Sequence, residues 1–160
     1  MRIRSISTLF VAALLVGMTA ARATATDSRA GLVTAKRSSF GRIVFDGRGF
    51  VLYGFTRDRR GKSTCVGACA RAWPPYIVKS TPHAGSRVVG ARLGRMKRPD
   101  GRLQATYYGH PLYYYVGDRR PGQILCQNVS EFGGFWRVVR PNGSLVTSKM
   151  RRSVQRSAAG

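Results

Sequence analysis

The sequence predicts a mainly β protein, in which two β-hairpin repeats form one small sheet-based domain with one short helix at about residues 64–73. Three observations predict this fold class. A seven-residue phrase occurs twice, runs of β-branched and aromatic residues flank Asp-Gly and Asn-Gly turns, and one stretch of small residues stops at a Pro-Pro pair. An internal repeat indicates that one structural unit is used twice.

The repeated phrase covers residues 52–58 and 112–118. Both copies read L-Y-x-aromatic-x-x-D, and both are followed directly by Arg-Arg. Around each phrase the same plan returns, with a hairpin before it and a cysteine and then a tryptophan after it. We therefore expect repeat 1 at residues 40–76, a linker at 77–90 and repeat 2 at 91–147.

The first 25 residues have the layout of a secretory signal peptide. A basic head at residues 1–4 precedes a short apolar run at residues 9–16, and two A-x-A patterns follow. The apolar run is too short to span a bilayer of ~30 Å, and the cleavage region has no lipobox cysteine. We expect a secreted or cell-envelope protein, with residues 26–39 as a flexible basic arm.

Repeat 1 is expected to begin with a hairpin. Residues 42–45 and 50–55 are rich in β-branched and aromatic side chains, and Asp46-Gly47 lies between them. The helix would follow, with Ser63 or Thr64 as its cap and Pro74-Pro75 as its end. Trp73 would dock this helix on the sheet.

Repeat 2 contains three further turn signals. Asp100-Gly101 and Gly109-His110-Pro111 separate strand-like segments, and Asn142-Gly143 lies within a final hairpin. Residues 148–160 are basic and polar, and are expected to form a disordered tail. The five tyrosines of this repeat, at positions 107, 108, 113, 114 and 115, are interpreted as core and cross-strand residues, with an exposed aromatic platform as the alternative.

The charge of the chain is strongly positive. There are 28 Lys and Arg against 6 Asp and Glu, which gives a formal net charge of +22. Such a field attracts polyanions, including anionic cell-envelope polymers and lipid headgroups. The basic residues are spread over the chain and no nucleic-acid-binding motif is present, so we expect no specific nucleic-acid partner. The sequence leaves the oligomeric state open.

The three cysteines allow three disulfide pairings, each of which leaves one free thiol. Export favours a disulfide. We favour Cys65–Cys69 with Cys126 free and buried, while a bridge from Cys126 to either partner stays open. A metal site built from these cysteines and His110 has suitable ligand types but no supporting spacing. The C-x-x-x-C spacing also differs from the C-x-x-C of thiol-redox enzymes.

The sequence predicts no catalytic residues, no metal site and no cofactor. It contains no Ser-His-Asp order and no phosphate-binding loop, and His83 and His110 stand in turn-like contexts beside prolines. We interpret the chain as a non-enzymatic exported β-repeat protein with affinity for anionic surfaces. The alternative is a redox or metal-handling secreted protein that uses Cys65, Cys69, Cys126 and the tyrosine cluster.

Five segments give the chain a resemblance to a known family: LYGFTRD, GKSTCVGACARAWPP, KRPDG, TYYGHPLYYYVGD and EFGGFWRVVRPNG. They resemble the bacterial secreted-repeat lipoproteins of unknown function, predicted lipoproteins with a Y-x-[FWY]-x-x-D motif. The motif positions that the resemblance implies are Tyr53, Phe55, Asp58, Tyr113, Tyr115 and Asp118, for which we expect a structural role. The resemblance implies location and architecture and carries a family-level association with alkane catabolism, which nothing in these residues explains.

Overall fold

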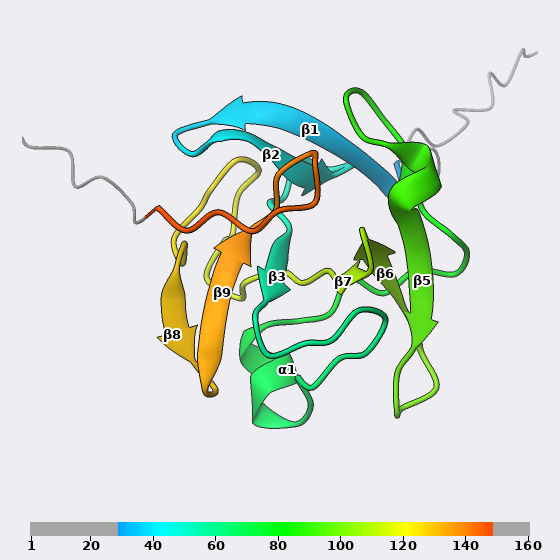
Figure 1. Ribbon diagram of the computed structural model, residues 1–160, viewed down its shortest axis with the longest axis vertical. Helices are drawn as coiled ribbons and strands as arrows, with labels where there is room; N and C mark the ends of the chain where they lie inside the picture. The colour runs from blue at the N-terminus through cyan, green and yellow to red at the C-terminus, as the bar shows by residue number, and fades with distance from the viewer. Residues whose placement is uncertain (1–28, 149–160) are drawn as a thin grey trace, which may run out of the picture.

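The computed structural model describes residues 29–148. The predicted signal peptide and residues 149–160 of the predicted tail lie outside the described residues. The strands are β1 Leu32–Ser38, β2 Gly41–Asp46, β3 Tyr53–Phe55, β4 His83–Ala84, β5 Leu93–Lys97, β6 Leu103–Tyr107, β7 His110–Pro111, β8 Val129–Glu131 and β9 Gly134–Val138, and the helical segments are α1 Ala68–Ala72 and a 3-10 turn at Gly90–Arg92. Figure 1 shows short strands arranged around the central strand β3, with α1 at one end. The predicted mainly β fold is confirmed.

The strands form three sheets of three strands each, in the orders β2-β1-β4, β3-β9-β8 and β5-β6-β7. Two clusters of buried side chains make up the core. One cluster surrounds Trp73 and Trp136, and the other surrounds Leu52, Leu112 and Tyr107. None of the helical segments in the described part of the chain is long and apolar enough to cross a membrane.

The first hairpin begins earlier than predicted. β1 pairs antiparallel with β2 from Val33↔Asp46 to Ser38↔Gly41. The prediction of a flexible arm over residues 26–39 is therefore wrong for Leu32–Ser38. Val33 and Ala35 are buried at alternating positions of β1, but two apolar residues in a small, basic segment gave too weak a period-two signal to find the strand.

The predicted turn at Asp46-Gly47 does reverse the chain. The N–H of Asp46 donates to the Phe50 carbonyl at 2.9 Å, and Phe45 bridges Val51. The return strand then leaves its expected partner, because β3 pairs with β9 near the other end of the chain. The predicted hairpin of residues 42–45 with 50–55 is thus right only at its tip.

Repeat 2 starts with the same kind of hairpin. β5 pairs antiparallel with β6 from Leu93↔Tyr107 to Lys97↔Leu103, around the predicted Asp100-Gly101 turn. A second turn, with positive φ at Tyr108 and Gly109, joins β6 to β7. Both predicted reversals are confirmed.

The extended segment after Trp73 pairs with repeat 2 instead of with its own repeat. The N–H of Tyr76 donates to the Leu112 carbonyl, and the N–H of Ala105 donates to the Tyr76 carbonyl, each at 2.9 Å. Ile77 continues this pairing by bridging Gln104. Residues from the end of repeat 1 thus form part of the β structure of repeat 2.

The strand after Trp136 makes the reciprocal exchange. β9 pairs with β3, and beyond its end the N–H of Val44 donates to the Val139 carbonyl at 2.9 Å. Val139 lies three residues after Trp136, as Tyr76 lies three residues after Trp73. Each repeat therefore completes its backbone hydrogen bonds with the segment that follows the tryptophan of the other repeat.

The helix α1 is shorter than the predicted 64–73. It begins after Gly67, which caps it without a side-chain hydrogen bond, and it ends before Trp73 and the Pro-Pro pair. Ser63 and Thr64 were expected to cap this helix, and that expectation is wrong. Both side chains are hydrogen-bonded to other partners, Thr64 to Asp58 and Ser63 to Arg98 and Tyr113.

Candidate functional site

Four aromatic side chains stack through the centre of the first core cluster. The rings of Trp73 and Trp136 are parallel within 3°, with centroids 4.1 Å apart. Phe55 stacks on Trp136 at 4.1 Å, and Tyr115 lies against Trp73 at 4.7 Å. Phe55 and Tyr115 hold the same position in the two phrases, so each phrase covers the tryptophan of the other repeat.

The first tyrosines of the two phrases lie beside this stack. Tyr53 presents its edge to Trp73 at 5.2 Å, and Tyr113 presents its edge to Trp136 at 5.1 Å. Their backbones pair with each other through two N–H to carbonyl hydrogen bonds of 2.9 Å. Edge-to-face and stacked geometries are the favourable arrangements of aromatic rings.

The tyrosine and aspartate of the phrase bond across the two repeats. The Tyr53 hydroxyl donates to Asp118 Oδ2 at 2.7 Å, and the Tyr113 hydroxyl donates to Asp58 Oδ2 at 2.5 Å. The other oxygen of each carboxylate accepts a backbone N–H from the loop that follows, from Thr64 in one repeat and from residue 125 in the other. The two tyrosine–aspartate hydrogen bonds therefore join the repeats at two equivalent points.

Burial sets the protonation of these groups. Burial raises the pKa of Asp58 and of Asp118, and the hydrogen bonds that their carboxylates accept offset part of that rise. Burial also holds the pKa of Tyr53 and of Tyr113 above the ordinary value of a phenol. Both hydroxyls thus remain hydrogen-bond donors at neutral pH.

A buried arginine extends the network on the repeat 1 side. Arg98 is 4% exposed, and its guanidinium donates to Ser63 Oγ at 3.0 Å, to Gln104 Oε1 at 2.5 Å and to the Cys65 carbonyl at 2.7 Å. Because the single proton of the Tyr113 hydroxyl goes to Asp58, the Ser63 hydroxyl is the donor in its 2.7 Å hydrogen bond with Tyr113. The sequence did not indicate this arginine, because charged residues are usually exposed and Arg98 stands beside a predicted turn.

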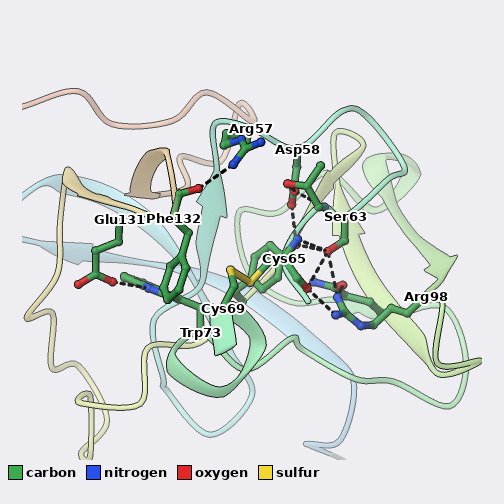
Figure 2. Close-up of a disulfide and its surroundings, with 12 residues drawn as sticks. Arg57, Asp58, Ser63, Cys65, Cys69, Trp73, Arg98, Glu131 and Phe132 are labelled. Atoms are coloured by element: carbon green, nitrogen blue, oxygen red, sulfur yellow. Dashed lines mark hydrogen bonds between the residues drawn. A yellow bond between two sulfur atoms is a disulfide. The ribbon is translucent and has the colours of Figure 1, made fainter. Parts of the chain in front are cut away.

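The favoured disulfide is present. Cys65 and Cys69 are joined, with their Cα atoms 5.2 Å apart, next to Trp73 (Figure 2). Cys126 is free and half-buried, and burial raises the pKa of its thiol. The Cys126 thiol beside the Tyr115 hydroxyl raises the pKa of Tyr115 to about 12.

The candidate metal ligands do not come together. Within residues 29–148, no three His, Cys, Asp or Glu side chains lie close enough to share a metal ion. His83 is exposed in β4, whereas His110 in β7 is half-buried, and burial together with the nearby Arg60 lowers its pKa. The structure thus gives no support to the metal-handling alternative within this part of the chain.

The tyrosines of repeat 2 face the interior. Tyr107 and Tyr113 are fully buried, and the Tyr107 hydroxyl donates to the Pro141 carbonyl at 2.5 Å. The half-buried Tyr114 donates to Asp46 Oδ2 at 3.0 Å. The core and cross-strand interpretation is confirmed, and the exposed aromatic platform is not formed.

The internal repeat is also found by comparison with known proteins. The sequence profile of a family described as a secreted repeat of unknown function matches residues 33–76 and 94–140. The chain belongs to this family. No curated protein and no solved structure matches it. The first match starts within β1, which agrees with the early start of the first hairpin.

The carboxylates of this secreted-repeat protein are used internally. Every carboxylate side chain in residues 29–148 accepts a hydrogen bond from the protein itself; these are Asp46, Asp58, Asp100, Asp118 and Glu131. In the same part of the chain, the arginines that form ion pairs are Arg48, Arg98 and Arg102. Most basic side chains of the secreted-repeat domain therefore face solvent without a carboxylate partner.

One surface hollow is lined mainly by such unpaired bases. Its walls are Arg57, from the end of the first phrase, and Arg59, Lys62 and Thr64, from the loop that follows. Asp58 belongs to the same loop, but its carboxylate turns inward to Thr64 and Tyr113. The sequence indicated a charged loop here, but it could not show that the Asp58 carboxylate is bonded to Thr64 and Tyr113 instead of to the bases of the loop.

Proposed function

We propose that this secreted-repeat protein is a non-enzymatic exported protein that binds anionic surfaces at the cell envelope, either polymers or lipid headgroups. The observation that carries the proposal is the internal use of the carboxylates. Residues 29–148 contain 21 Lys and Arg against 5 Asp and Glu, and only Arg48, Arg98 and Arg102 form ion pairs, so 18 of these 21 basic side chains have no carboxylate partner in this part of the chain.

The charge gives this proposal a physical basis. A surface with a large excess of one sign attracts counter-charged polymers over roughly a Debye length, which is ~8 Å at physiological salt. Near an anionic bilayer, each Lys or Arg contributes about 1 kcal/mol to binding. A few bases that face one surface together are therefore enough for measurable retention.

The placement of the motif residues supports a binding role over an enzymatic one. The tyrosines and aspartates of the two phrases point into the core and bond to each other. A catalytic group needs access to its substrate, normally in a cleft with further polar groups. The residues left for contact with a partner are those of the surface, among which the basic side chains carry the excess charge.

The test is retention of the purified protein on surfaces of defined charge. Neutral vesicles, anionic vesicles and an anionic cell-wall polymer are each sedimented with the protein at low salt and at ~0.15 M salt. We expect retention on at least one anionic surface at both salt concentrations, with none on neutral vesicles. Loss of all retention at ~0.15 M salt would overturn the proposal, because only nonspecific attraction would remain.

A further inference from the structure

The hairpin between β8 and β9 has an unusual residue at its tip. Phe132 and Gly133 form a two-residue turn with φ of 53° and 77°. Positive φ at both positions defines a type I′ turn, which favours Asn, Asp or Gly because a bulky residue is strained there. Phe132 occupies the first of these positions and is 41% exposed. The fold thus places a partly exposed aromatic residue at a turn position that favours Asn, Asp or Gly.

The arginine of the first phrase, Arg57, lies against the tip of this hairpin. Arg57 Nη1 donates to the Phe132 carbonyl at 2.9 Å (Figure 2). A Cβ atom at Gly134 would lie 2.7 Å from Arg57 Cγ, and one at Gly133 would lie 3.0 Å from Arg57 Nη1. The two glycines therefore leave the space that the arginine side chain occupies.

Arg57 also belongs to the basic hollow, together with Arg59 and Lys62. Arg57 therefore connects the basic hollow to the hairpin tip, through its hydrogen bond to the Phe132 backbone carbonyl. We call these four residues the tip surface: Arg57, Arg59, Lys62 and Phe132. Within residues 29–148, none of these bases forms an ion pair. The nearby Glu131 accepts the Trp73 Nε1–H at 2.9 Å, so its carboxylate is held by the core.

We propose that the tip surface docks on an anionic lipid bilayer. Phe132 enters the boundary between headgroups and acyl chains, and Arg57, Arg59 and Lys62 contact headgroup phosphates. An apolar side chain beside unpaired bases fits a lipid surface, because the partner must offer an apolar layer under a layer of negative charge. This inference rests on the proposed function and names one anionic surface as its partner.

The internal repeat provides a matched control. Arg119 and Arg120 follow Asp118 as Arg59 and Arg60 follow Asp58, and all four are exposed. In the second repeat the Gln123 side chain accepts the backbone N–H groups of Arg119 and Arg120. Removing two charges from either loop changes the net charge equally, so only the position of the charges differs.

The first experiment measures binding of the full chain to vesicles of phosphatidylcholine with phosphatidylglycerol at ~0.15 M salt. We expect Arg59→Gln/Lys62→Gln to weaken binding about thirtyfold, since each of the two bases near the surface contributes about 1 kcal/mol. We expect Arg119→Gln/Arg120→Gln to weaken it less than about twofold. Equal losses in the two variants would overturn the inference.

The second experiment separates lipid contact from folding. Phe132→Asn places a residue that tolerates positive φ in the turn, so its melting temperature should stay the same or rise. The same variant should bind the vesicles about tenfold more weakly, because burial of an aromatic side chain contributes at least ~1.5 kcal/mol. Leu125→Asn, which removes another exposed apolar residue of repeat 2, should leave binding unchanged. Unchanged binding by Phe132→Asn would overturn the inference.

The outcomes distinguish this inference from the proposed function. If the wild-type protein binds anionic vesicles and the tip variants bind as well as the controls, the tip surface is not the docking site and the proposed function stands. If the protein is retained on the cell-wall polymer but not on vesicles, the lipid inference fails and the polymer is the partner. If no anionic surface retains it, both fail.

Discussion

The two repeats reach their tryptophans by different routes. In repeat 1, the segment from Asp58 to Trp73 contains the Cys65–Cys69 disulfide and the short helix α1. In repeat 2, the segment from Asp118 to Trp136 contains the hairpin of β8 and β9 and no disulfide. The ends of both segments are nevertheless equivalent, since each aspartate accepts a hydroxyl from the other repeat and the two tryptophans stack on each other.

This difference shows which parts of the repeat are constrained. The ends are fixed because each one contacts the other repeat, so a change at one end would need a matching change at its partner. The connecting segments also contact the other repeat, Ser63 through Arg98 and Glu131 through Trp73, but these contacts are not equivalent in the two repeats, and a disulfide loop stands in one where a hairpin stands in the other. We therefore expect substitutions at the ends to have similar effects in the two repeats, and substitutions in the connecting segments to have different effects.

The largest expected effect comes from the stacked tryptophans. Trp73→Ala and Trp136→Ala should each lower the free energy of unfolding by about 3–5 kcal/mol, since each removes a fully buried ring from the centre of the stack. Chemical denaturation followed by circular dichroism measures the loss. A difference of more than ~2 kcal/mol between the variants would show that the connecting segments, and not the stack, decide stability.

The disulfide gives the sharpest contrast between the connecting segments. Cys65→Ala/Cys69→Ala should lower the free energy of unfolding by about 2 kcal/mol, because opening so short a loop releases that much chain entropy in the unfolded state. Cys126→Ala, at the free thiol of repeat 2, should cost less than ~1 kcal/mol. Reducing agent should destabilise the wild-type protein and leave the double variant unchanged. The prediction is contradicted if neither the double substitution nor the reducing agent lowers the stability.

The elements that depend on neighbouring residues could be predicted from the sequence. The Asp100-Gly101 turn, the hairpin it closes and the Cys65–Cys69 pair all involve residues fewer than about fifteen positions apart. Glycine in a turn and a short C-x-x-x-C spacing are local signals, and they needed no knowledge of the rest of the fold. The equivalence of the two phrases was also visible, because a repeat is a property of the sequence itself.

The exchange between the repeats could not be predicted, because it depends on contacts between distant residues. The phrase predicts that Asp58 ends a strand, but its tyrosine partner lies 55 positions away. The hairpin of β8 and β9 was missed for a different reason. Its turn contains Phe132 where a turn signal would place Asn or Asp, and the residue that hides the turn from sequence reading is the one proposed to contact lipid.

The tyrosine–aspartate pairs test the exchange directly. Tyr113→Phe should cost about 1–3 kcal/mol and more than Tyr53→Phe, since the Tyr113 hydroxyl bonds to both Asp58 and Ser63. Asp58→Ala and Asp118→Ala should each lower the melting temperature.

In a double-mutant cycle, Tyr53→Phe with Asp118→Ala should show coupling above ~0.5 kcal/mol. The matched cycle within one phrase, Tyr53→Phe with Asp58→Ala, should show almost none, and the opposite result would refute the exchange.

The smallest expected effect is the pH dependence of these carboxylates. Burial raises the pKa of Asp58 and Asp118 above the unfolded value of about 3.9, so the folded protein holds their protons more tightly than the unfolded chain. The stability that this tighter proton binding contributes is fully present below pH ~3.9. It is lost as the pH rises through the pKa of each carboxyl group in the folded protein. Asp58→Asn and Asp118→Asn remove this dependence, so the melting temperature of each variant relative to wild type should rise between pH 4 and pH 7. Titrating groups far from these carboxylates contribute equally to both proteins and cancel in the difference, whereas His110 interacts with the charge of Asp58. Parallel curves of melting temperature against pH for wild type and both variants would contradict the prediction. They would show that burial in the folded protein does not change the pKa of Asp58 or Asp118.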